Sequence, residues 1–204
     1  MSFLDTLGLQ HDALDKSSKG QDYLKSYEMF LNPRGRPVKL LEMGVRRGES
    51  LRLWKEWFWQ GQIVGMDINP ECLGHTEDRI AIEIGDQSNV ADLERVVRKH
   101  GPFDVIVDDA GHEPDNQIFA FQMLLPQLAK RGVYILEDIG IPSERDGGAS
   151  IGDYRASLSM ARLAHRVLHS SVSMDDEFER FIEVWAPQIE MMAFIRHSVI
   201  TKIK

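Results

Sequence analysis

The sequence contains a single cysteine, no excess of basic residues and no long apolar run. Cys72 alone cannot form an internal disulfide, which excludes a disulfide framework and favours a reducing compartment. The formal net charge of −8 argues against a nucleic-acid-binding surface and against attraction to anionic membranes, since both usually require a basic surface. No apolar stretch reaches the roughly 18 residues of a transmembrane helix, and the first residues lack the pattern of a signal peptide. These absences predict a cytoplasmic protein without nucleic-acid or membrane partners.

Short apolar runs alternate with segments whose apolar residues have helical spacing. With 204 residues, 43% of them hydrophobic, the chain is long enough for one domain with a buried core. Continuous apolar strands separated by helices predict an α/β fold, with a parallel sheet covered on both faces. We expect a flexible or weakly helical lead-in over 1–21, a loop over 141–151 and a C-terminal hairpin over 189–203. The predicted strands are 38–43, 63–67, 80–84, 103–107 and 133–136, and the predicted helices are 22–31, 51–58, 90–100, 118–128 and 153–168.

A glycine-bearing turn follows the first predicted strand. Gly44 and Gly48 lie between that strand and the start of a helix. Glycines allow a ligand to approach backbone N–H groups, and a helix start favours negative charge. The spacing lacks the third glycine of the dinucleotide-binding fingerprint, which disfavours a nicotinamide oxidoreductase. An ordinary strand–helix turn would show the same glycines, so other residues must decide between the two interpretations.

Polar residues follow the second and third predicted strands. Asp67 ends the second strand, about 20 residues beyond the glycine turn, where an acid can accept both ribose hydroxyls. Asp86 and Gln87 follow the third strand. Helix capping is the alternative function for these residues. Together with the glycine turn, they favour a nucleoside-containing cofactor.

The strongest candidate site lies after the fourth and fifth predicted strands. Asp108 and Asp109 end the fourth strand, His112 follows closely, and Glu137 and Asp138 end the fifth. Neighbouring parallel strands end at the same edge of a sheet, so these side chains should lie together. Clustered carboxylates suit a hard cation, and an imidazole with an ordinary pKa near 6.5 suits general-base catalysis. Helix capping by the acids and a structural histidine are the alternatives.

These stretches resemble a known family. The pattern Glu-x-Gly-x-x-x-Gly, starting at Glu42, resembles motif I of class I S-adenosylmethionine-dependent methyltransferases. The run from Asp108 to His112, followed by Glu137-Asp138, resembles the metal-dependent sugar O-methyltransferases of antibiotic biosynthesis, including the macrolide, novobiocin-type and cephalosporin-cluster enzymes. Their usual motif is Asp-Asp-Gly-Ser-His, so Ala110-Gly111 is a departure. Asp15-Lys16 and the terminal hairpin also resemble this family.

The resemblance implies a Rossmann-like fold with a mostly parallel seven-stranded sheet and a C-terminal antiparallel hairpin. It divides the chain into a helical lead-in or lid over 1–37 and a methyltransferase domain over 38–204. Its reaction is Mg²⁺-assisted methyl transfer from S-adenosyl-L-methionine to a hydroxyl group of a sugar or polyol. The implied metal ligands are Asp109, Glu137 and Asp138, the implied general base is His112, and the implied cofactor-binding residues are Glu42, Gly44, Gly48, Ser50, Asp67, Asp86, Gln87 and Asp108.

The acceptor is the least defined part of this interpretation. A glycosylated or amino-sugar small molecule is expected, with natural-product tailoring as the setting. N-methylation of an amino-sugar, a catechol-type O-methyltransferase and a cofactor-binding regulatory protein without catalysis are the alternatives. Members of the family are commonly oligomeric, so the resemblance leaves room for a homo-oligomer.

Overall fold

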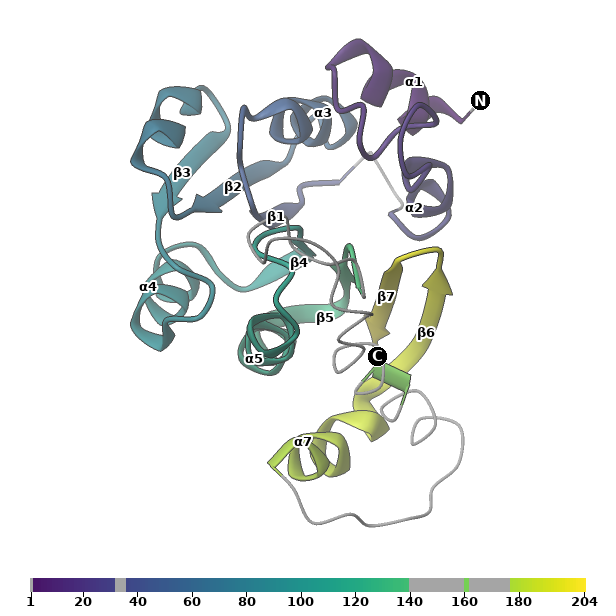
Figure 1. Ribbon diagram of the computed structural model, residues 1–204, viewed down its shortest axis with the longest axis vertical. Coiled ribbons are helices and arrows are strands. Elements are labelled where there is room, and N and C mark those ends of the chain that lie inside the picture. The colour runs from purple at the N-terminus through teal and green to yellow at the C-terminus, as the bar shows by residue number, and fades with distance from the viewer. Residues whose placement is uncertain (1, 32–35, 140–159, 162–176) are drawn as a thin grey trace.

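The computed structural model describes residues 2–31, 36–139, 160–161 and 177–204. Within them, a seven-stranded sheet has the order β3-β2-β1-β4-β5-β7-β6 (Figure 1). The first five strands pair in parallel, and β6 and β7 form an antiparallel hairpin at the β5 edge. The prediction of a mostly parallel sheet with a C-terminal hairpin is confirmed. The strands are β1 (Lys39–Met43), β2 (Gln62–Asp67), β3 (Ile80–Ile84), β4 (Phe103–Asp108), β5 (Leu128–Leu136), β6 (Ile189–Ile195) and β7 (Ser198–Ile203).

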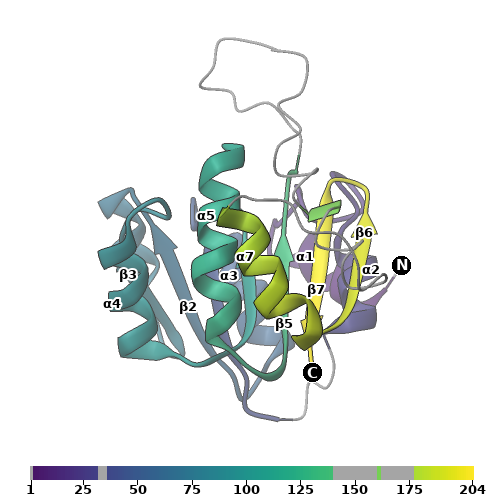
Figure 2. The ribbon, with the colours of Figure 1, turned by 90° about the horizontal axis from the view of Figure 1, so that it is seen from below.

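Helices cover both faces of the sheet, as Figure 2 shows. One face carries α1 (Phe3–Gln10), α2 (Leu24–Phe30) and α3 (Glu49–Trp57), and the other carries α4 (Val90–His100), α5 (Pro114–Leu124) and α7 (Glu177–Trp185). Successive strand residues point to opposite faces, so Leu40 packs with the first helix layer and Leu41 with the second. Short 3₁₀ helices occupy η1 (Pro70–His75), η2 (Leu125–Gln127) and η4 (Ala186–Gln188).

Local signals explain where α4 and α5 begin and end. The Asn89 side chain accepts the N–H of Ala91 at 2.9 Å and caps α4, whose last turn carries three basic residues that complement the helix dipole. Pro114 opens α5 at a position where a missing N–H costs nothing. Helix α5 ends at Leu124, earlier than predicted. Strand β5 then begins at Leu128 instead of 133, because the exposed Lys130 and Arg131 interrupt its apolar pattern.

The lead-in is more ordered than the sequence predicts. Ser2 caps α1 by accepting the N–H of Asp5 at 3.2 Å, and Leu4 and Leu7 are buried in the same cluster as α3. Where the sequence predicts a flexible or weakly helical start, the structure has a capped helix with a buried apolar face. Apart from residues 160 and 161, the predicted loop over 141–151 and helix over 153–168 lie outside the described residues.

The strand order determines where a ligand can bind. The chain runs outward from β1 through β2 to β3 and then returns to place β4 on the other side of β1. The helices after β1 and β4 therefore pack on opposite faces, which leaves a crevice at the carboxyl ends of these strands. None of the helices in the described part of the chain has the length and apolarity needed to cross a membrane.

Candidate active site

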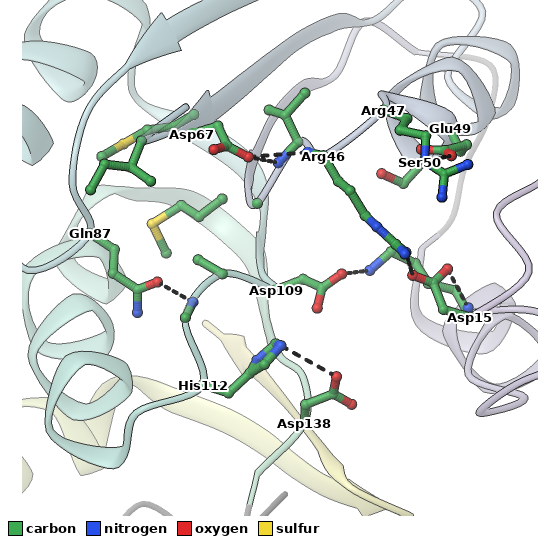
Figure 3. A pocket seen from close by; sticks show the side chains of 18 of the residues that line it. Asp15, Arg46, Arg47, Glu49, Ser50, Asp67, Gln87, Asp109, His112 and Asp138 are labelled. Atoms are coloured by element: carbon green, nitrogen blue, oxygen red, sulfur yellow. Dashed lines mark hydrogen bonds and ion pairs between the residues drawn. The ribbon is translucent and has the colours of Figure 1, made fainter. Parts of the chain in front are cut away.

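A cavity of about 1190 Å³ lies at this crevice. Figure 3 shows its lining, which comes from the ends of β1 to β5 and from the segment between α1 and α2. Eight of the sequence-predicted site residues line it: Gly44, Ser50, Asp67, Asp86, Gln87, Asp109, His112 and Asp138. The other four, Glu42, Gly48, Asp108 and Glu137, lie beside the cavity without lining it.

Both glycines of the turn have a positive φ, and Gly44 also has no room for a side chain. Gly44 has a φ of +90°, and a Cβ there would collide with the carbonyl oxygen of Asp109. Gly48 has a φ of +71° and directly precedes α3. The turn therefore passes directly beside the end of β4, and the cofactor-type motif touches the acidic loop.

Asp67 holds the glycine turn in place. Its Oδ2 accepts the backbone N–H of Val45 at 2.8 Å and that of Arg46 at 3.1 Å, and its Oδ1 accepts the N–H of Asn69 at 2.8 Å. Burial opposes ionisation, but these three hydrogen bonds keep the pKa of Asp67 below its ordinary value. The side chain is thus a carboxylate at the cavity wall.

Asp86 and Gln87 have different surroundings. Asp86 Oδ1 accepts the N–H and the hydroxyl of Ser88, at 2.8 and 2.7 Å, as a capping acid does. Gln87 reaches across the cavity, and its Oε1 accepts the N–H of Gly111 at 2.8 Å (Figure 3). Its Nε2 is buried without a hydrogen-bond partner among the described residues. Gln87 therefore ties the cofactor side of the cavity to the acidic loop and keeps a free donor.

Asp108 and Asp109 point in different directions, although they are adjacent. Asp108 is buried, its Oδ2 accepts the hydroxyl of Tyr134 at 3.0 Å, and burial raises its pKa to about 7. Its carboxyl group therefore belongs to the core under the site. Asp109 faces the cavity, and its backbone N–H donates to the carbonyl of Met43 at 3.0 Å.

Among the residues that the structure describes, Asp109, His112 and Asp138 form a group whose side-chain atoms could together bind a metal ion. One atom from each lies within 4.8 Å of the others. His112 Nε2 is 3.6 Å from Asp138 Oδ2. His112 and Asp138 have φ values of +58° and +55°, a left-handed conformation that is costly for side chains of this size. The two side chains point toward each other (Figure 3).

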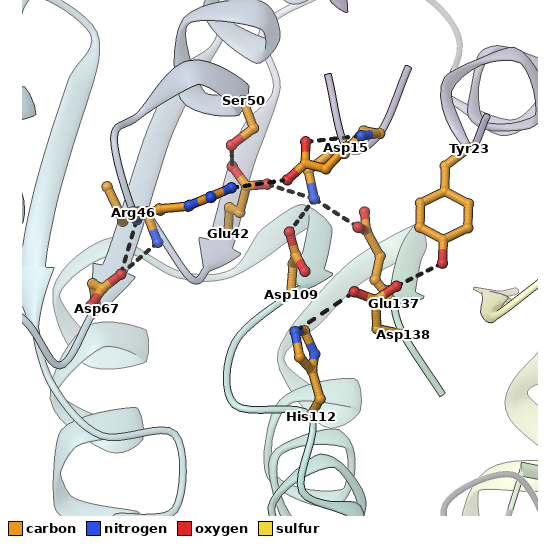
Figure 4. A network of polar contacts seen from close by, with 12 residues as sticks. Asp15, Tyr23, Glu42, Arg46, Ser50, Asp67, Asp109, His112, Glu137 and Asp138 are labelled. Atoms are coloured by element: carbon orange, nitrogen blue, oxygen red, sulfur yellow. Dashed lines mark hydrogen bonds and ion pairs between the residues drawn. The ribbon is translucent and has the colours of Figure 1, made fainter. Parts of the chain in front are cut away.

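Glu137 lies next to this group but faces a lysine. Its Oε2 accepts a hydrogen bond from Lys16 Nζ at 2.7 Å, and its Oε1 is buried with no partner in the described structure. Lys16 Nζ also binds Asp109 Oδ2 and lies 3.6 Å from Glu42 Oε1 (Figure 4). Burial opposes the charge on Lys16, but the surrounding carboxylates raise its pKa well above the ordinary value, so it is an ammonium ion.

The residues fit a hard divalent cation. Oxygen donors from Asp109, Glu137 and Asp138 lie at the ends of two adjacent strands, which is the chemistry that Mg²⁺ prefers. Two buried atoms without a partner in the described structure, Glu137 Oε1 and His112 Nδ1, leave hydrogen-bonding or ligand capacity unused. Burial raises the pKa values of Asp109 and Glu137, and a bound cation would oppose this shift.

Comparisons with known proteins agree with this geometry. No protein-family model matches the chain. It is 37% identical, over 67% of its length, to the 8-demethyl-8-(2-methoxy-alpha-L-rhamnosyl)-tetracenomycin-C 3'-O-methyltransferase of Streptomyces olivaceus. It is 36% identical, over 54% of its length, to the mycinamicin VI 2''-O-methyltransferase of Micromonospora griseorubida. These alignments cover 36% and 29% of the relatives, so the chain spans about a third of the curated relatives it matches.

A solved structure extends the similarity to the whole chain. MycE methyltransferase from the mycinamycin biosynthetic pathway, in complex with Mg and SAH, superposes with a TM-score of 0.81 at 24% identity. The match covers 99% of this chain and 54% of that chain. The chain has the class I methyltransferase fold. The sequence of the same chain is similar to sugar O-methyltransferases of antibiotic pathways.

In this methyltransferase fold, the site contains two residues that the sequence left without a role. Lys16 belongs to the Asp-Lys pair noted in the sequence, and Tyr23 lies within the helix predicted over 22–31. Tyr23 donates its hydroxyl to Asp138 Oδ1 at 2.7 Å. The sole sequence signal for these contacts is the Asp15-Lys16 pair ahead of a tyrosine-rich segment, because nothing in a local pattern marks a lysine as buried.

Proposed function

We propose that this chain transfers a methyl group from S-adenosyl-L-methionine to a hydroxyl group of a sugar or polyol in a glycosylated or amino-sugar small molecule, with Mg²⁺ bound at the acids. The observation that carries the proposal is a single cavity with a glycine turn and Asp67 on one side and Asp109, His112 and Asp138 on the other. The relatives named as sugar O-methyltransferases support it. Cys72, a buried free thiol, fits a cytosolic location.

The cofactor would lie along the ends of β1, β2 and β3. The glycine turn, with Gly44 and Gly48, leaves room for the methionine part beside the start of α3. Asp67 is a carboxylate that can accept the ribose hydroxyls. Glu42, to which Ser50 donates a hydrogen bond at 2.7 Å, is buried behind the turn, where it would act on the cofactor's ammonium group through its negative charge. Asp86 and Gln87, which line the cavity after β3, would lie near the adenine. Asp108, also expected to bind the cofactor, is buried under the site and does not line the cavity.

The acceptor would lie at the ends of β4 and β5. Asp109, Glu137 and Asp138 would hold the metal, which when bound orients neighbouring sugar oxygens and lowers the pKa of the reacting hydroxyl. His112 Nε2 takes the hydroxyl proton, and the Asp138 carboxylate 3.6 Å away stabilises the resulting imidazolium. The acceptor oxygen then forms a bond to the methyl carbon while the carbon–sulfur bond breaks, which leaves S-adenosylhomocysteine.

Positioning supplies much of the remaining effect. The contact between Gly44 and the Asp109 backbone fixes the distance between the two halves of the cavity. The bond from Gly111 to Gln87 fixes the loop that carries His112. Holding two reactants in one geometry removes entropy from the barrier before the chemical step.

The test combines binding and turnover. Calorimetry should show binding of S-adenosylhomocysteine, and a panel of deoxysugar and amino-sugar natural products should show methyl transfer that EDTA abolishes. His112→Ala should lower kcat by about 10²- to 10⁴-fold without changing the affinity for S-adenosylhomocysteine, and His197→Ala, on the exposed hairpin turn, is the matched control. Absence of cofactor binding would refute the methyltransferase proposal. Full turnover by His112→Ala would refute the base assignment.

A further inference from the structure

We propose that the segment between α1 and α2 supplies two positioning residues, Lys16 and Tyr23, which hold the acids of the site in place. The inference rests on the proposed function, because it gives these residues a role toward the metal. Each of the three acids assigned to the metal accepts a hydrogen bond from this segment: Asp109 and Glu137 from Lys16, and Asp138 from Tyr23. The segment would then be part of the active site, in addition to covering it.

Lys16 connects the ends of three strands. Its side chain is only 2% exposed, and its Nζ lies among Glu42 from β1, Asp109 after β4 and Glu137 after β5. Figure 4 labels these three acids, and their carboxylates point toward a common centre. Several carboxylates this close repel one another, and a cation among them offsets this repulsion and holds them close together. A neutral side chain of the same length would lose this effect while filling the same space.

Tyr23 holds the remaining acid without adding charge. Its hydroxyl donates to Asp138 Oδ1 at 2.7 Å, while Oδ2 of the same carboxylate faces His112. Its ring is buried and stacks on Tyr27 with centroids 5.7 Å apart. Asp138 also has a left-handed φ of +55°, and the hydrogen bond from Tyr23 fixes where its carboxylate points. One oxygen is thus fixed, and the other stays directed into the site.

The two residues form one unit. The backbone carbonyl of Lys16 accepts the N–H of Tyr23 at 2.9 Å and that of Leu24 at 3.1 Å, at the start of α2. The segment is also anchored to α1, since Ser18 donates its N–H to the buried carboxylate of Asp5 at 2.7 Å. A displacement of the segment would therefore move both contacts at once.

The first experiment uses Tyr23→Phe, with Tyr27→Phe as the matched control because it removes a hydroxyl from the stacked neighbour. Mn²⁺ affinity is measured by electron paramagnetic resonance, S-adenosylhomocysteine affinity by calorimetry and folding by thermal unfolding. Tyr23→Phe should weaken Mn²⁺ binding by about 10-fold, as loss of a ligand's hydrogen-bond partner does, while cofactor affinity and Tm match the control. Mn²⁺ affinity equal to that of the control would overturn the assignment of Tyr23.

The second experiment uses Lys16→Met, with Lys25→Met on the exposed side of α2 as the control. Lys16→Met should lower Tm in EDTA, and Mg²⁺ should then raise Tm by more than it does in the wild type, because the metal replaces the lost cation. An equal Mg²⁺ effect in both proteins would refute the role of Lys16. If Lys16→Met does not fold, the Tyr23→Phe measurement decides the proposal.

Measuring Mn²⁺ binding and S-adenosylhomocysteine binding separately distinguishes this inference from the proposed function. Mn²⁺ binding that depends on Tyr23, without binding of S-adenosylhomocysteine, would support the positioning role and refute the methyltransferase. Cofactor binding without any Mn²⁺ binding would refute the positioning role and leave the cofactor site intact.

Discussion

Replacing Glu42 by glutamine should change how the stability of this protein depends on pH. The side chain is fully buried at the end of β1, where it accepts a hydrogen bond from Ser50 and lies 3.6 Å from Lys16 Nζ. Burial disfavours its charged form and raises its pKa from 4.5 to about 7, although both neighbours oppose the shift. The folded protein therefore binds this proton more tightly than the unfolded chain does.

The sign and the magnitude follow from that difference. Between the unfolded pKa of 4.5 and the folded value of about 7, the folded state holds more protons, so the free energy of unfolding falls as pH rises. The slope from this group is at most about 1.4 kcal/mol per pH unit, and the total loss is about 3 kcal/mol. The loss is complete above the folded pKa. Glutamine cannot titrate, so this contribution disappears in the variant.

Urea unfolding in EDTA, between about pH 5 and pH 8, measures the effect. The difference in unfolding free energy between wild type and Glu42→Gln should change by about 3 kcal/mol across that range, with the wild type losing stability relative to the variant as pH rises. Glu94→Gln, on the exposed face of α4, is the control and should run parallel to the wild type. Parallel curves for Glu42→Gln and the wild type would show that Glu42 titrates normally.

Three further substitutions test other parts of the site. Gly44→Ala must place a side chain at a φ of +90° against the Asp109 carbonyl, so it should cost more than about 2 kcal/mol in thermal unfolding; a smaller loss would show that the turn can shift. Asp67→Asn should weaken S-adenosylhomocysteine binding by about 10-fold in calorimetry and leave Mn²⁺ binding unchanged, and an equal loss of both would indicate a purely structural role. Tyr134→Phe removes the hydrogen bond to Asp108 and should cost about 1–3 kcal/mol in urea unfolding, with no dependence on Mg²⁺.

The parallel sheet could be predicted from the sequence because its strands are short apolar runs, buried on both faces. Residues 103–107, for example, are apolar at all positions except Asp104, and they form most of β4. The start of β5 could not be predicted, since Lys130 and Arg131 are exposed there and give no alternation. Pairing with the neighbouring strands determines this part of the strand, and a local pattern does not contain that information.

The candidate site likewise contains residues that could be placed from the sequence and one that could not. Asp109 and Asp138 could be placed together because each follows a strand, and parallel neighbours end at one edge. Lys16 could not be placed, because its partners lie in β1 and after β4 and β5, far along the chain. A lysine in a polar segment is normally exposed, and only the tertiary structure shows one that is buried among carboxylates.

The hydrogen bond between Gln87 and Gly111 bears on how the acidic motif can vary. Gln87 binds the backbone N–H of Gly111, a group that every residue except proline possesses. Gly111 does not need a left-handed φ, and a Cβ there would meet the flexible end of the Glu113 side chain, which can turn aside. A serine at this position, as in the usual motif of the family, would keep the bond that holds the loop. The exchange of Gly-Ser for Ala110-Gly111 is therefore a substitution that this loop can absorb, and the orientation of His112 does not depend on the side chain before it.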